Sequence, residues 1–236
     1  MLFRSAAAFA HGLAPRLPAL DAGDPRLWRL AFLSAALHRR QALGGVERIA
    51  YGDGRVLLSD ADALSSGLWR KSMLYLRYRD GLEIWINGSD VPWEVRVGAD
   101  LVTLPPAGWH AAGPGFACAS LTIGGRRVEF VRAAEYDYHD GGGGESFALD
   151  LACAAPVVAR TGTAGRGRTR SFWFPGTAAR VGLGPGLLPA GARIVRRAAT
   201  GADGEPVPAP DLVADGDRAW LVPASGTRRM ELEWTN

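Results

Sequence analysis

Residues 74–109 read LYLRYRDGLEIWINGSDVPWEVRVGADLVTLPPAGW, and this stretch decides the fold class. Apolar side chains alternate with polar ones over residues 74–79, which is the two-residue period of a half-buried strand. Asp80-Gly81 predicts a type I′ turn, because both central residues of that turn need a positive φ. The alternation resumes in three further segments, residues 82–87, 93–97 and 101–104, before Pro105-Pro106 prevents further pairing. The stretch therefore predicts consecutive antiparallel strands, with Leu82 and Ile84 facing the core.

Length and composition bound the class of protein. The chain has 236 residues, 47% of them hydrophobic, and a net charge of +3, so it can bury a core as one large or two small domains. The basic residues are almost all arginines and are scattered, so no nucleic-acid-binding face is predicted. No apolar run reaches the roughly 20 residues of a transmembrane helix, so no membrane partner is predicted. The alanine-rich start favours a helix over a signal peptide, because His11-Gly12 interrupts it, and the compartment stays open.

The order of the segments predicts a mostly β protein, in which antiparallel β-sandwich domains follow one or two N-terminal α-helices. Helical spacing covers residues 3–14 and the segment from Asp24-Pro25 to Gly44-Gly45, where the Asp-Pro pair is a good helix start. We divide the chain into a helical segment at residues 1–45, a sandwich at 46–140 and a second, smaller sandwich-like domain at 146–236. The acidic and glycine-rich residues 135–144 are interpreted as a loop at the boundary.

Two strings carry a resemblance to a known class of enzyme. RIAYGDG at residues 48–54 leads into the strands, and RYRDGLEIWINGSDVPWEV at 77–95 is followed by LPPAGW at 104–109. This order resembles the C-terminal region of bacterial (β/α)8-barrel glycoside hydrolases, where the end of the barrel is followed by β-sandwich domains. In such enzymes the catalytic carboxylates lie at the C-terminal ends of barrel strands. The resemblance places those strands upstream of Met1, so it transfers no catalytic residue to this chain.

The resemblance implies a non-catalytic accessory β-domain region of a carbohydrate-active protein, whose partner is a carbohydrate or a catalytic barrel domain. Two alternatives remain. The chain can be a free-standing carbohydrate-binding module, or an interaction protein that docks on a separate catalytic chain. The sequence shows no Ser/His/Asp arrangement that would indicate an enzyme of its own.

Aromatic residues are the candidates for carbohydrate binding, because a flat ring stacks on the C–H face of a sugar. The alternation predicts that the Trp85 side chain points outward, and burial as core residues is the competing interpretation for all of the candidates. The set consists of Trp85, Trp93, Trp109, Tyr136 and Tyr138.

A second candidate site is a cluster of oxygen and imidazole groups beside a glycine run, formed by Glu135, Asp137, His139 and Asp140. Calcium is the cofactor that such a loop would hold. A solvated polar loop is the alternative, because the spacing of an EF-hand is absent. Cys118 and Cys153 are the two cysteines; they show no zinc-site spacing, and whether they pair stays open.

Overall fold

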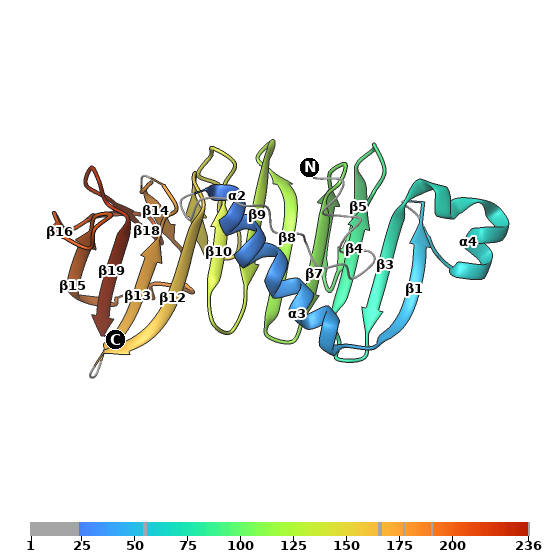
Figure 1. Cartoon of the computed structure of the whole chain (residues 1–236), viewed down its shortest axis with the longest axis horizontal. Coiled ribbons are helices and arrows are strands. Elements are labelled where there is room, and N and C mark those ends of the chain that lie inside the picture. The colour runs from blue at the N-terminus through green and yellow to red at the C-terminus, as the bar shows by residue number, and fades with distance from the viewer. Residues whose placement is uncertain (1–23, 54–55, 165–166, 177, 190, 236) are drawn as a thin grey trace. The chain divides into compact units, whose positions relative to one another are not determined.

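The computed structural model describes residues 24–53, 56–164, 167–176, 178–189 and 191–235, and it is mostly β with antiparallel strands (Figure 1). One helical segment precedes the strands and is built from α2 (Pro25–Trp28), the π-helical turn η1 (Arg29–Ser34) and α3 (Ala35–Leu43). A short helix, α4 (Asp60–Ser66), and a 3-10 turn, η2 (Leu68–Lys71), come later. The predicted mostly β, sandwich-like fold class is confirmed. The helix predicted over residues 3–14 lies outside the described residues.

The helical segment begins and ends where its sequence predicts. The Asp24 carboxylate accepts the backbone N–H of Arg26 at 2.8 Å, and the Asp24 carbonyl accepts that of Leu27 at 2.9 Å. These bonds satisfy N–H groups that the first turn of a helix leaves without a partner. At the other end Gly44 takes an extended conformation and donates to the Arg40 carbonyl at 3.1 Å.

The chain divides into two compact units. Within the described residues, unit 1 contains residues 30–127 and 131–133, and unit 2 contains residues 24–29, 128–130 and 134–235. Strand β9 (Arg126–Arg132) contributes residues to both units. The first residues of the helical segment therefore belong with the second half of the chain.

Unit 1 is built on an antiparallel sheet with the strand order β2-β1-β3-β4-β7-β8. Leu82 and Ile84 lie in its core as predicted. Helix α3 covers one face of this sheet, where Gln41 Nε2 donates to the Tyr78 hydroxyl at 3.2 Å. The strands are β1 (Val46–Gly52), β2 (Leu57–Ser59), β3 (Met73–Tyr78), β4 (Glu83–Asn87), β7 (Trp109–Gly113) and β8 (Phe116–Ile123).

Two details of the predicted meander are wrong. The turn after β3 is a three-residue loop, which is closed by a hydrogen bond of 2.8 Å from the Tyr78 N–H to the Leu82 carbonyl. Within this loop only Gly81 has a positive φ. It is therefore not a type I′ turn. In addition, β5 (Trp93–Val97) and β6 (Asp100–Leu104) leave the sheet as a separate hairpin, and β4 pairs with β7 instead.

The Asn87 side chain explains why this hairpin leaves the sheet. Its Nδ2 group donates to the carbonyls of Val91, Leu104 and Pro105 at 2.7 to 3.1 Å, and its Oδ1 atom accepts from Ser89. These bonds hold the residues just before β5 and at the end of β6 beside the end of β4. A sequence pattern of apolar alternation does not contain this information.

Replacement of Asn87 by alanine is expected to lower the free energy of unfolding of unit 1 by about 2 kcal/mol, because buried carbonyl groups lose their donors. Urea denaturation measures the change. Ser89→Ala is the comparison within the same network, because it removes only the hydroxyl that donates to Asn87 Oδ1 and leaves the three carbonyl contacts of Asn87 Nδ2, and it should cost less than about 1 kcal/mol. Equal effects of the two substitutions would contradict the role given to Asn87.

Unit 2 is a sandwich of two antiparallel sheets. Its larger sheet has the order β10-β12-β13-β19-β15-β16, and its smaller sheet has the order β11-β14-β18-β17. Phe172, Leu221, Met230 and Leu232 are among the residues that fill the core. The strands are β10 (Asp137–Asp140), β11 (Leu151–Cys153), β12 (Val157–Ala164), β13 (Gly167–Trp173), β14 (Val181–Leu183), β15 (Arg193–Thr200), β16 (Pro206–Val207), β17 (Asp211–Asp215), β18 (Arg218–Val222) and β19 (Arg229–Thr235).

Candidate functional site

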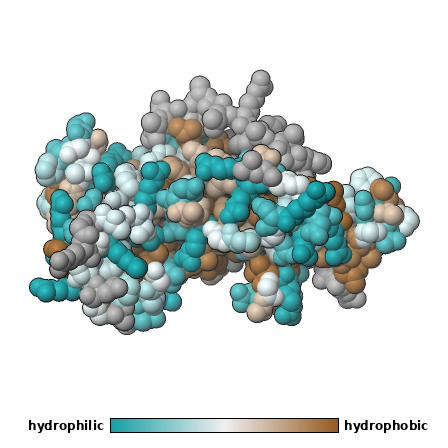
Figure 2. Space-filling model, turned by 90° about the horizontal axis from the view of Figure 1, so that it is seen from below, coloured by the Kyte–Doolittle hydropathy of each residue, from teal (hydrophilic) through white to brown (hydrophobic). Residues whose placement is uncertain are grey.

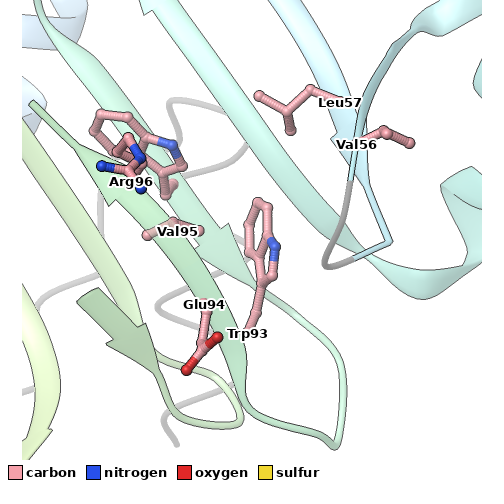
Figure 3. A pocket seen from close by; sticks show the side chains of 7 residues that line it. Val56, Leu57, Trp93, Glu94, Val95 and Arg96 are labelled. Carbon is pink, nitrogen blue, oxygen red and sulfur yellow. The ribbon is translucent and has the colours of Figure 1, made fainter. Parts of the chain in front are cut away.

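Unit 1 contains a small open pocket of about 210 Å³ between the sheet and the β5–β6 hairpin. Figure 3 shows it from close by. Its lining brings together aromatic, aliphatic and charged side chains from three separate segments. The lining residues are Val56, Leu57, Trp85, Trp93, Glu94, Val95 and Arg96.

Trp85 lies on β4 and faces the side of the sheet opposite to Ile84, as the alternation predicts. That side is covered, however, and Trp85 is only 5% exposed. Its ring packs against Tyr75 at 5.3 Å and against the edge of His110 at 6.0 Å, measured between ring centroids. The expectation of an outward, solvent-facing Trp85 is therefore wrong, because alternation determines the face of a sheet and not what covers it.

Trp93 supplies one wall of the pocket from the first residue of β5. Its ring lies so close to Gly52 that an added Cβ atom there would approach it to 2.6 Å. In Figure 3 the ring extends toward Leu57 and Val56, which are 37% and 52% exposed. The pocket thus has an apolar interior that is accessible mainly along the two aliphatic side chains.

Glu94 and Arg96 add opposite charges to the pocket. They alternate along β5 with the buried residues Trp93 and Val95 and are themselves exposed. In Figure 3 the Glu94 carboxylate points away from the Trp93 ring. A carboxylate acceptor and a guanidinium donor beside apolar surface can bind a ligand that has both C–H faces and hydroxyl groups.

The structure brings together only two of the five aromatic candidates. Trp85 and Trp93 line the pocket. Trp109 pairs with Ile86 in the sheet of unit 1 and is fully buried. Tyr136 and Tyr138 belong to unit 2, where Tyr138 is buried and Tyr136 is half-buried.

The proposed calcium ligands do not converge. Residues 137–140 form strand β10 and not a loop, so Asp137 and His139 alternate with Tyr138 and Asp140 on its two faces. Asp137 forms an ion pair with Arg170, and Asp140 accepts the backbone N–H of Gly142 at 3.0 Å. Glu135 is exposed. Across the described residues, no group of three or more His, Cys, Asp or Glu side chains is placed to hold a metal ion.

Sequence reasoning missed a buried charge cluster in unit 2. Arg29 donates from Nε and Nη2 to the two Glu129 oxygens, at 2.5 and 2.7 Å. Burial raises the pKa of Asp140, and burial together with the nearby Asp140 and Glu129 raises that of Tyr138. The residues of the pair are 100 positions apart, so no spacing in the sequence could have identified them.

The two thiols are not joined. Cys118 and Cys153 are both free and buried, and burial raises the pKa of each, to about 12 for Cys153. A protonated, inaccessible thiol is a poor nucleophile and metal ligand. Both cysteines therefore act as small apolar core residues.

No protein family, no curated protein and no solved structure matches the chain. None of the helices in the described residues is long and apolar enough to cross a membrane.

Proposed function

We propose that the chain is a non-catalytic accessory β-domain region of a carbohydrate-active protein, and that the pocket of unit 1 binds a sugar. The observation that carries the proposal is the joining of Trp85 and Trp93, two half-exposed aliphatic side chains and an opposite pair of charges in one pocket. Apolar surface matches the C–H faces of a sugar ring. Glu94 accepts and Arg96 donates hydrogen bonds to hydroxyl groups.

The size of the pocket restricts the ligand. Its volume of about 210 Å³ lies below the range of roughly 300–1,000 Å³ that is usual for small-molecule sites. A single sugar ring, such as the end of a glycan chain, fits this space better than a long internal segment. Trp85 and Trp93 are 5% and 4% exposed, so the ligand contacts only a small part of each ring.

Calorimetric titration with a panel of oligosaccharides tests the proposal. Arg96→Ala and Glu94→Gln are expected to weaken binding about tenfold or more, because each removes a charged hydrogen-bonding group. Arg79→Ala, at an exposed residue in the turn before β4, is the matched control and should bind as the parent chain does. Failure of every oligosaccharide to bind, or unchanged binding by both pocket variants, would rule the proposal out.

A docking protein is the second candidate, and exposed apolar side chains in unit 1 favour it. Val46, Ile49, Leu64 and Trp69 are between 40% and 63% exposed. Figure 2 shows hydrophobic residues gathered beside α4. Concentration-dependent association in light scattering that Leu64→Gln and Trp69→Gln remove would favour docking over glycan binding.

A further inference from the structure

The outward face of the larger sheet in unit 2 carries an ordered row of side chains. Val158, Trp173, Arg229 and Thr200 are direct neighbours across β12, β13, β19 and β15. Val158 is buried, so the accessible part of the row begins at Trp173. The alternate residues of these strands, such as Phe172 and Met230, fill the core. Trp173 and Arg229 therefore point away from the core, on the opposite side of the sheet.

Trp173 is flanked by two guanidinium groups. The Arg160 and Arg229 guanidinium carbons lie 5.7 and 5.2 Å from its ring centroid. The two arginines come from the strands on either side of β13, so they approach the ring from opposite sides. A guanidinium stacked on an aromatic ring loses little further freedom when it binds an anion, and its N–H edge remains available for a bidentate contact.

Small side chains beside Trp173 and its two flanking arginines leave a hollow. Ser171 and Ala198 lie in the next row of the same face, and a depression of about 200 Å³ opens between Arg229 and Arg196. A second, larger hollow of about 550 Å³ also adjoins Arg196, but Arg197, which points to the other face of the sheet, and Leu212 of β17 line it as well. Arg196 belongs to both hollows. Outward-facing arginines lie on three of the four strands of this face, β12, β19 and β15.

The charges of this face are unequal. Four arginines point outward from it, at positions 160, 193, 196 and 229, against two carboxylates, Glu231 and Glu233. Glu231 is shared by Arg229 at 3.1 Å and by Arg196 at 3.9 Å. Within the described part of the chain Arg160 contacts the Trp173 ring and forms no ion pair. The face can therefore accept a ligand with well-separated negative charges.

We propose that this face of unit 2, which we call the arginine face, binds an anionic polysaccharide with one carboxylate on each sugar. A planar carboxylate matches the fork of a guanidinium, and the apolar side of a sugar ring matches the edge of Trp173. A nucleic acid fits less well. Glu231 and Glu233 repel its closely spaced phosphates, and the guanidinium groups of Arg160 and Arg229 already contact the Trp173 ring, which leaves less of the ring for a base to stack on. The proposal uses none of the residues of the pocket in unit 1.

Binding of polygalacturonate, measured by affinity electrophoresis and calorimetry at 150 mM salt, tests the proposal. Arg160→Ala and Arg229→Ala are each expected to weaken binding about tenfold. Arg168→Ala replaces an exposed arginine on the opposite face of β13 and should change the affinity for polygalacturonate less than twofold. Arg160 is the sharper probe, because it has no ion pair whose loss could disturb the fold, and circular dichroism checks that each variant is folded.

Three further ligands make the outcome decisive. A neutral galactan should not bind, and heparin and a single-stranded oligonucleotide should bind more weakly than polygalacturonate. Equal affinity for the neutral polymer, tighter binding of heparin or the oligonucleotide, or no effect of Arg160→Ala would overturn the proposal. Arg96→Ala separates it from the sugar pocket, because that substitution should leave polygalacturonate binding unchanged.

Discussion

Glu129→Gln is expected to lower the free energy of unfolding of unit 2 by about 3 kcal/mol, because it removes the carboxylate charge that two hydrogen bonds hold against the largely buried Arg29 guanidinium. The side chains of Arg29 and Glu129 are 19% and 8% exposed, and two short hydrogen bonds join them. Burial lowers the pKa of Arg29, but the hydrogen bond to Glu129 and the charge of that carboxylate, together with the nearby Asp140, outweigh burial and raise that pKa. The Arg29 guanidinium therefore stays ionised in the fold.

Urea denaturation followed by far-UV circular dichroism measures this loss. Glu231→Gln is the matched control in the same unit, because its ion pairs are more exposed and should contribute less than about 1 kcal/mol. The double variant Arg29→Met with Glu129→Leu should recover much of the stability, since apolar residues of similar size often replace a buried pair without loss. A single-variant cost no larger than that of the control would show that the pair is not a stabilising contact.

The parts of the fold that the sequence predicts are those that depend on local pattern. Alternation places β3 and β4 correctly, and Asp24 marks the start of the helical segment. Strand pairing was not predictable in the same way. The β5–β6 hairpin leaves the sheet, and the Asn87 amide binds three carbonyls at its two ends. A side-chain contact of this kind has no periodicity.

The candidate site was predictable only in part for the same reason. Trp85 and Trp93 stand out in the sequence as large aromatic residues, but Leu57 and Arg96 join them only after β2 and the hairpin have folded. The proposed calcium ligands show the converse. They are neighbours in the sequence, and the strand conformation sends them to opposite faces. Proximity along the chain is therefore a poor guide to a metal site unless the local conformation is known.

Acidification below pH 6.5 is expected to destabilise both units, because His110 in unit 1 and His139 in unit 2 are buried and the fold keeps them neutral. Burial lowers the pKa of His110 in unit 1 to about 4. Burial also lowers the pKa of His139 in unit 2 to about 4, although the backbone of Ser146 partly opposes the shift. Their ordinary pKa in an unfolded chain is about 6.5, so between these values the unfolded state binds more protons than the folded state.

The sign of the effect follows from this difference. Above pH 6.5 each neutral histidine makes its full contribution to the free energy of unfolding. That contribution is lost progressively as the pH falls from about 6.5 to about 4. A shift of this size corresponds to up to about 3 kcal/mol for each histidine. Asp140 acts in the opposite direction, because burial raises its pKa and its protonated form is favoured in the fold.

Urea midpoints measured from pH 7.5 to pH 4.5 test the two histidines separately. His110→Phe keeps an aromatic ring beside Trp85 and should flatten the pH dependence of unit 1 while leaving that of unit 2 unchanged. His139→Phe should do the reverse. Tryptophan fluorescence reports on both units, and proteolysis followed by mass spectrometry assigns each transition to its unit. A pH dependence that both substitutions leave intact would show that other groups cause the acid instability.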